Sequence, residues 1–260
     1  MGKKVAFITG ATSGIGAAFA CHFAQKGYDL IITGHPDDKI PPCIEQMKEK
    51  YNASIEIIFA DLAKENDIAR VEEIIKREQK IEILINSAGF TFWKPFWMNN
   101  VKELESMIKV HISAPVRFIY ATLPKMIEKK KGVIINLSSL SSFMPVPKDS
   151  MYSATKLFHN SFMESLHCSV KDKGIKVQVL CPGFVYSNFH KRAGLKQSDL
   201  KNGGIIRWMQ PEKVVEISVR NLKKKNKVIV VPGWRNKLIK FIVTNLPRSL
   251  YYTLATKFLQ

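Results

Sequence analysis

Tyr152 and Lys156 are the residues of this sequence best suited to acid–base chemistry. They stand four positions apart in a helical pattern, 151–173, so they share one helix face. A free phenol, with a pKa of ~10, exchanges protons poorly at neutral pH, but a nearby ammonium lowers that pKa. The pair predicts a general acid or base that exchanges a proton with a reacting oxygen. An isolated Tyr-x-x-x-Lys is also typical of a solvated helix face.

A glycine-rich turn offers a second kind of chemistry. It reads Thr9-Gly10-Ala11-Thr12-Ser13-Gly14-Ile15-Gly16 and joins an apolar run to a helical pattern. Glycines let the backbone approach a ligand closely, and a helix N-terminus presents free N–H groups to a pyrophosphate. Between a strand and a helix, this turn predicts a dinucleotide site rather than a plain tight turn.

The elements that position these residues alternate along the chain. Apolar strand patterns, followed in most cases by helical ones, predict a parallel sheet buried on both faces. We therefore predict one α/β domain over residues 1–232, a Rossmann-type doubly wound sheet of about seven strands with helices on both faces. An irregular insertion, 184–210, and a C-terminal segment, 233–260, break the rhythm. The strands are expected at 4–9, 30–33, 54–60, 81–86, 132–139, 175–180 and 227–231, and the helices at 14–25, 42–51, 66–78, 101–129, 151–173 and 211–224.

The spacing Gly-x-x-x-Gly-x-Gly resembles that of the short-chain dehydrogenase/reductase family. Four other segments resemble the family's motifs in the same order, over about residues 3–232. They are Asp61-Leu62, Asn86-Ser87-Ala88-Gly89 (where the family has Asn-Asn-Ala-Gly), Ser139 with Tyr152-Ser153-Ala154-Thr155-Lys156, and Cys181-Pro182-Gly183 with Ser187.

This resemblance implies an oxidoreductase that exchanges hydride between a nicotinamide cofactor, NAD(P)(H), and a carbonyl or alcohol substrate. It implies catalytic roles for Ser139, Tyr152 and Lys156. The implied cofactor-binding residues are Gly10, Thr12, Ser13, Gly14, Ile15, Gly16, His35, Asp61, Leu62, Asn86, Ala88, Gly89, Tyr152, Lys156, Pro182, Gly183, Val185 and Ser187.

His111 departs from the family pattern. The family has an asparagine at the aligned position, where it anchors a water that leads to the catalytic lysine. An imidazole can anchor a water or move a proton itself, so we expect His111 at the catalytic site. The alternatives are a hydrogen-bonded core histidine and a weakened catalyst.

The choice of cofactor depends on the end of the second strand, which reads Thr33-Gly34-His35-Pro36. A carboxylate at that end would bind a ribose diol and select NAD. His35 stands instead where phosphate-selecting members often carry arginine, although Asp37 and Asp38 follow. We therefore predict a preference for NADP(H), with NAD(H) as the alternative.

Bulky apolar residues follow the strands that should carry the site. Examples are Phe92 and Trp93 after the fourth strand and Phe184 and Phe189 after the sixth. Pockets lined in this way favour apolar ligands. The expected substrate is a bulky, apolar carbonyl or alcohol, although ordinary core packing would also explain these residues.

Composition limits the partners and the compartment. The net charge is +18, and residues 217–260 contain ten Lys or Arg and no acidic residue. None of the four cysteines form a C-x-x-C pair, so we expect reduced cysteines, no metal site and a cytoplasmic protein. No apolar run reaches the ~18 residues that would suggest a transmembrane helix.

Segment 233–260 has apolar residues at helical spacing with Lys and Arg between them. We predict a basic amphipathic helical extension that packs on its own domain or in a homo-oligomer, a dimer or tetramer. Peripheral membrane contact is the alternative, and no motif indicates nucleic acid. The function predicted overall is an NADPH-dependent carbonyl reductase. The alternative is a nucleotide-binding protein with weak or no turnover, acting as a redox sensor or partner-binding protein.

Overall fold

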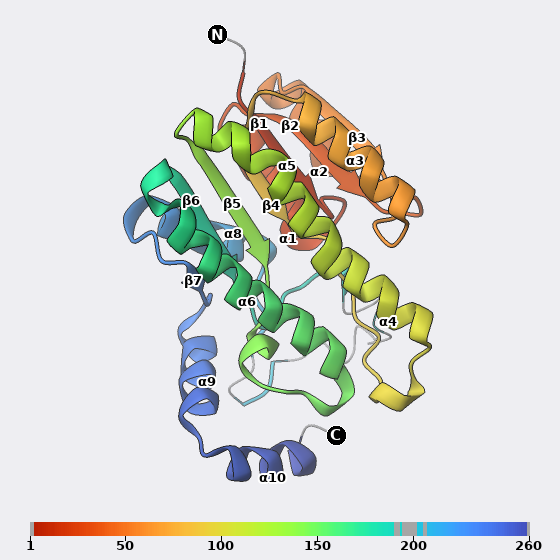
Figure 1. Ribbon diagram of the computed structural model, residues 1–260, viewed down its shortest axis with the longest axis vertical. Coiled ribbons are helices and arrows are strands. Elements are labelled where there is room, and N and C mark those ends of the chain that lie inside the picture. Colours follow the sequence, from red (N-terminus) through yellow and green to blue (C-terminus); the bar gives the residue numbers. More distant parts are fainter. Residues whose placement is uncertain (1–2, 190–192, 194–201, 205–206, 259–260) are drawn as a thin grey trace.

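The computed structural model describes residues 3–189, 193, 202–204 and 207–258, and a seven-stranded sheet lies at its centre (Figure 1). The strand order is β3-β2-β1-β4-β5-β6-β7, and every pair is parallel. This confirms the predicted doubly wound α/β fold. The strands are β1 (Val5–Thr9), β2 (Asp29–Gly34), β3 (Ile55–Phe59), β4 (Ile81–Asn86), β5 (Gly132–Leu137), β6 (Ile175–Leu180) and β7 (Ile229–Val230).

Helices cover both faces of the sheet (Figure 1). Successive strand residues point to opposite faces, so in β1 Phe7 packs in one hydrophobic cluster and Ile8 in the other. This is why the strands are apolar at almost every position. One face is covered by α1 (Gly14–Gln25), α2 (Pro42–Tyr51) and α8 (Pro211–Lys224), and the other by α3 (Glu65–Arg77), α5 (Ala114–Glu128) and α6 (Ser150–Val170).

The strand order reverses between β1 and β4. The chain runs outward through β2 and β3 on one side, then returns to β4 and continues outward on the other. In open α/β sheets, ligands bind beside the carboxyl ends of the strands at such a switch point. The topology therefore places the glycine turn after β1 beside the loop after β4.

A π-helical turn interrupts the segment predicted as one long helix, 101–129. The run consists of α4 (Val101–Ile108), a π turn (Lys109–Ser113) and α5. A π turn holds one more residue than an α turn and is frequent at functional sites. It places His111 on the inner side of the run, where the ring is fully buried.

The C-terminal segment forms two helices, α9 (Trp234–Asn245) and α10 (Arg248–Phe258), rather than one continuous helix. Pro247 lies between them, and proline has no N–H to continue a helix. The Tyr251 hydroxyl donates to the Pro145 carbonyl, and Lys240 Nζ lies 4.5 Å from the centre of the Phe143 ring. The extension is thus packed against its own domain. No helix among the described residues is long and apolar enough to cross a membrane.

Candidate active site

The glycine turn after β1 can be built only with glycine at its ends. Gly10 has a φ of +62°, and a Cβ there would lie 2.7 Å from the Ala88 Cα. A Cβ on Gly16 would lie 2.2 Å from the Gly10 carbonyl oxygen. Both approaches involve backbone atoms, which cannot move aside as a flexible side chain can. The turn is therefore held close to the loop after β4, and Gly10, Thr12, Ser13 and Gly14 line a cavity at the start of α1.

Thr9 joins this turn to the loop after β4. Its Oγ1 accepts hydrogen bonds from the N–H groups of Ser87 (3.0 Å) and Ala88 (3.1 Å). Ser87, the departure from the family pattern, contributes its backbone here. The two loops are thereby fixed at the switch point of the sheet.

One cavity of about 670 Å³ runs along these loops to the start of α6. Most of the residues predicted from the sequence line it, and Gly16, Asn86 and His111 are the exceptions. Gly16 packs behind the turn, while Asn86 is buried and donates from Nδ2 to Asn136 Oδ1. The lining residues among the predicted set are Gly10, Thr12, Ser13, Gly14, Ile15, His35, Asp61, Leu62, Ala88, Gly89, Ser139, Tyr152, Lys156, Pro182, Gly183, Val185 and Ser187.

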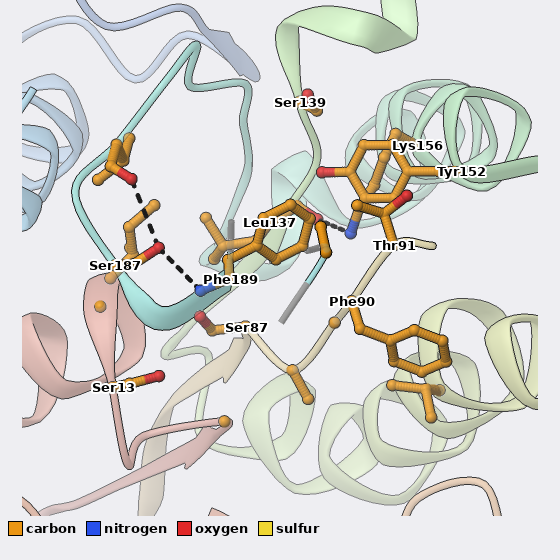
Figure 2. A pocket seen from close by; sticks show the side chains of 18 of the residues that line it. Ser13, Ser87, Phe90, Thr91, Leu137, Ser139, Tyr152, Lys156, Ser187 and Phe189 are labelled. Atoms are coloured by element: carbon orange, nitrogen blue, oxygen red, sulfur yellow. Dashed lines mark hydrogen bonds between the residues drawn. The ribbon is translucent and has the colours of Figure 1, made fainter. Parts of the chain in front are cut away.

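Ser139, Tyr152 and Lys156 lie at one end of this cavity, and Ser13 and Ser187 lie across it (Figure 2). Tyr152 and Lys156 are one turn apart on α6, with Lys156 Nζ 5.3 Å from the centre of the tyrosine ring. Lys156 Nζ also donates to the Leu137 carbonyl at 3.0 Å. The spacing predicted from the sequence thus brings all three side chains to one place.

Burial controls the protonation of this group. It raises the pKa of Tyr152 above its ordinary value, and the nearby Asp149 carboxylate raises it further, whereas the Ser139 hydroxyl acts in the opposite sense. The sequence predicted that a nearby ammonium lowers the pKa of Tyr152. In the structure the effect of burial is larger, and it raises this pKa. Burial also lowers the pKa of Lys156 to about 8. At neutral pH the structure holds a protonated phenol beside a largely protonated amine.

His111 lies behind the cavity wall with both ring nitrogens hydrogen-bonded. Nε2 accepts from the Phe90 N–H at 3.0 Å, so the ring proton must be on Nδ1, which lies 2.9 Å from Thr155 Oγ1. Thr155 in turn donates to the Tyr152 carbonyl. Burial holds the pKa of His111 well below its usual value, so the ring is neutral.

These contacts tie the loop after β4 to the turn of α6 that carries Tyr152. Neither ring nitrogen of His111 is left to anchor a water, so in this structure the ring acts through the residues that it positions. Its part in a proton relay stays a prediction.

The far end of the cavity, at the carboxyl end of β2, contains His35 and three acidic residues. Asp38 Oδ2 accepts from Thr12 Oγ1 (2.5 Å) and from the His35 N–H (3.1 Å). The His35 ring lies 3.3 Å from an Asp37 carboxylate oxygen and 4.0 Å from one of Asp61. The Asp38 carboxylate is therefore turned toward the glycine turn, while the half-exposed imidazole faces the cavity.

The sequence reasoning missed several polar residues that line the cavity, among them Thr91 and Asp149. Both line the cavity and both are buried. Asp149 precedes α6, where aspartate is commonly an N-cap. Its side chain makes no capping hydrogen bond and instead accepts one from Thr91 Oγ1. The sequence held no signal for this contact, because Thr91 lies 58 positions away.

Known proteins share the fold and part of the sequence. A family model described as short chain dehydrogenase matches residues 4–198. The chain is 29% identical to the very-long-chain 3-oxoacyl-CoA reductase of Macaca fascicularis, over 96% of this chain and 78% of that protein. It is 30% identical to an uncharacterized oxidoreductase of Staphylococcus saprophyticus, over 84% of this chain and 97% of that protein.

Among solved structures, a short-chain dehydrogenase from Sphingobium yanoikuyae in complex with NADPH superposes with a TM-score of 0.83. The two are 25% identical, and the match covers 99% of this chain and 96% of the other. Fold and site together define a Rossmann-type, nucleotide-dependent oxidoreductase. The chain belongs to the short-chain dehydrogenase family.

Proposed function

We propose that this protein is an NADP(H)-dependent carbonyl reductase whose substrate is bulky and apolar. The observation that carries the proposal is the convergence of Ser139, Tyr152 and Lys156 on a cavity that is continuous with the glycine turn. A cofactor on the turn and a carbonyl beside the tyrosine would then share one cavity.

The residues of the cavity fit a dinucleotide. Gly10 and Gly14 line a cradle that a Cβ would fill or distort, Gly16 lets α1 begin directly behind the turn, and the N-terminus of α1 lies at this cradle. A pyrophosphate at that N-terminus would meet free N–H groups and the positive end of the helix dipole. The nicotinamide, when bound, supplies or accepts the hydride.

The chain's own residues handle the proton. Tyr152, held protonated by burial, donates its phenolic proton to the substrate oxygen as that oxygen becomes an alkoxide. Ser139 donates a hydrogen bond to the same oxygen and fixes its position. The ammonium of Lys156 stabilises the phenolate left behind, since an opposite charge nearby favours the ionised form.

The substrate half of the cavity supports an apolar ligand. It is lined mainly by aromatic and aliphatic side chains that follow β4, β5 and β6, with polar Thr91, Ser141 and Asp149 among them. Several relatives are very-long-chain 3-oxoacyl-CoA reductases, and long-chain 3-oxoacyl thioesters are one class of carbonyl with this character. The apolar lining residues are Phe90, Phe92, Trp93, Val110, Leu140, Met144, Val146, Phe184, Phe189 and Ala193.

The test is turnover of purified protein with NADPH and a panel of bulky ketones and 3-oxoacyl thioesters. Steady oxidation of NADPH that depends on a carbonyl supports the reductase. Tight NADPH binding without turnover on any carbonyl would favour the alternative, a nucleotide-binding protein that acts as a redox sensor or binds partners.

We expect NADPH to bind at least several-fold more tightly than NADH. The reason is that β2 ends at Gly34 without a carboxylate and that His35, which follows it, lines the cavity and would pair with a 2′-phosphate. His35→Asp should move the preference toward NADH, because a carboxylate repels the phosphate and accepts hydrogen bonds from a ribose diol. Fluorescence titration with both cofactors measures the ratio.

The matched control is Asp37→Asn on the same loop, where the wild-type carboxylate is almost fully exposed. Its removal takes away a negative charge and should keep or strengthen the NADPH preference. Equal or tighter binding of NADH by the wild type would show that the cofactor assignment is wrong.

We further infer that the outer face of α9 and α10 docks on an anionic lipid surface. Its exposed apolar side chains are Trp234, Leu238, Phe241, Ile242, Leu250, Tyr252 and Leu254, and Arg235, Lys237, Arg248 and Lys257 lie on the same two helices. A second copy packed here would bring like charges together, whereas anionic headgroups complement them.

Vesicle sedimentation tests this inference. The protein should sediment with phosphatidylcholine–phosphatidylserine vesicles, release in high salt and stay in solution with phosphatidylcholine alone. Trp234→Ser combined with Phe241→Ser should abolish sedimentation, and Tyr120→Ser, an equally exposed aromatic on α5, should not. Failure to sediment, together with a dimer in light scattering that the double variant disrupts, would assign this face to a homo-oligomer instead.

A further inference from the structure

Asp149 is a buried carboxylate at the catalytic end of the cavity that the proton transfer does not use. It lies between Val146 and α6, three residues before Tyr152, and is 7% exposed. The residue lines the cavity together with aromatic side chains of the loop after β4, among them Phe92 and Trp93. A charge in such surroundings is costly unless something pairs with it.

Only one of the two oxygens of this carboxylate has a hydrogen-bond partner among the described residues. Oδ1 accepts a hydrogen bond from Thr91 Oγ1, whereas Oδ2 has no hydrogen-bond partner among the described residues. Burial raises the pKa of Asp149 to about 6, and Thr91 and Lys156 oppose that rise. The carboxyl group is therefore mostly ionised at neutral pH. One oxygen of an ionised carboxylate is thus free on the wall of a mostly apolar pocket.

We propose that Asp149 is a specificity-determining residue that binds a hydrogen-bond donor on the substrate, close to the reacting carbonyl. The class of donor is a hydroxyl or an amide N–H. This deepens the proposed carbonyl reductase and rests on it: the substrate is bulky and apolar but carries one polar donor beside its carbonyl. A site built to bind such a donor rejects analogues that lack it, since the carboxylate then stays desolvated and unpaired.

Thr91 has a positioning role in this arrangement. Its hydroxyl fixes one carboxylate oxygen and thereby leaves the other to the ligand. Because Thr91 follows β4 and Asp149 precedes α6, the hydrogen bond also joins the two walls between which a substrate would lie.

Three bulky ketones form the probe series: benzoin, which carries a hydroxyl beside its carbonyl, its methyl ether, which lacks the donor, and deoxybenzoin, which lacks the oxygen. The wild type should show a kcat/KM about tenfold higher for benzoin than for the ether, the scale of a hydrogen bond to a charged group. In Asp149→Leu this ratio should fall to near one, while deoxybenzoin is still reduced.

Two further variants separate recognition from structural support. Asp149→Asn keeps the shape and an accepting oxygen, so it should retain part of the preference. Asp172→Leu, which removes an exposed carboxylate after α6, should leave the ratio unchanged. Equal loss of activity on all three ketones in the Asp149 variants would show a purely structural role, and a wild-type ratio near one would overturn the proposal.

Binding provides a readout that does not need turnover. Quenching of tryptophan fluorescence gives the Kd of each ketone for the NADPH-loaded protein. If no ketone is reduced, the proposed function fails, and the ratio of Kd values still decides the role of Asp149. A tighter Kd for benzoin that Asp149→Leu removes supports the site; equal Kd values overturn it.

Discussion

Tyr152→Phe should lower carbonyl turnover by ~10²-fold or more, the usual scale for the loss of a general acid. The substitution keeps the buried ring, which packs 5.7 Å from both His111 and Phe189 between ring centres. It removes only the proton that the substrate oxygen must receive. NADPH affinity should change by less than about threefold, because the hydroxyl addresses the substrate. Initial rates and a fluorescence titration on the same samples measure both quantities.

Tyr120→Phe is the matched control, since this tyrosine lies exposed on α5, away from the cavity. It should leave the rate unchanged. A Tyr152→Phe variant that reduces ketones at near the wild-type rate would show that another group donates the proton. The assignment of roles to Ser139 and Lys156 would then fail with it.

Gly10→Ala should remove most of the NADPH affinity, by at least tenfold, and lower the free energy of unfolding by ~3 kcal/mol. Its φ of +62° disfavours any L-residue, and the new Cβ would meet the Ala88 backbone at 2.7 Å. The loop after β4 would have to move away from the turn. Chemical denaturation and cofactor titration measure the two losses separately.

Gly27→Ala is the control that separates the backbone strain of a positive φ from a steric clash of the new Cβ. Gly27 has a similar φ, +78°, but a Cβ there meets nothing within 4 Å. It should cost ~1 kcal/mol through backbone strain alone and leave NADPH affinity intact. If both variants behave alike, the close contact between the turn and Ala88 does not shape the cofactor site.

The local part of the site could be predicted from the sequence because it depends on short spacings. The four-residue interval of Tyr152 and Lys156 fixes their common face, and the glycine pattern fixes the turn. The apolar strands likewise determine a sheet buried on both sides, since such runs cannot face water. These inferences need no knowledge of tertiary contacts.

The rest depends on contacts between distant segments. The π turn around His111 has no signature in the 3.6-residue pattern, so a single helix was predicted. The hydrogen bonds of that ring to Phe90 and Thr155 follow from packing three segments together. The break at Pro247 is different: the missing N–H of proline is visible in the sequence, but the apolar spacing of 233–260 was interpreted as one helical extension, and the two helices α9 and α10 are found only in the structure.

The attachment of α10 to Pro145 has a thermodynamic consequence. Tyr251 and Lys240 contact segment 143–146, and Met144 and Val146 of this segment line the cavity. If the outer face of α9 and α10 docks on lipid as proposed, the coupling free energy between the two sites is reciprocal. A ligand that shifts this segment would then change the lipid affinity by the same factor by which lipid changes the ligand affinity. Lipid bound to α9 and α10 would therefore change the affinity of the cavity for its ligand through the Tyr251–Pro145 hydrogen bond and the Lys240–Phe143 cation–π contact.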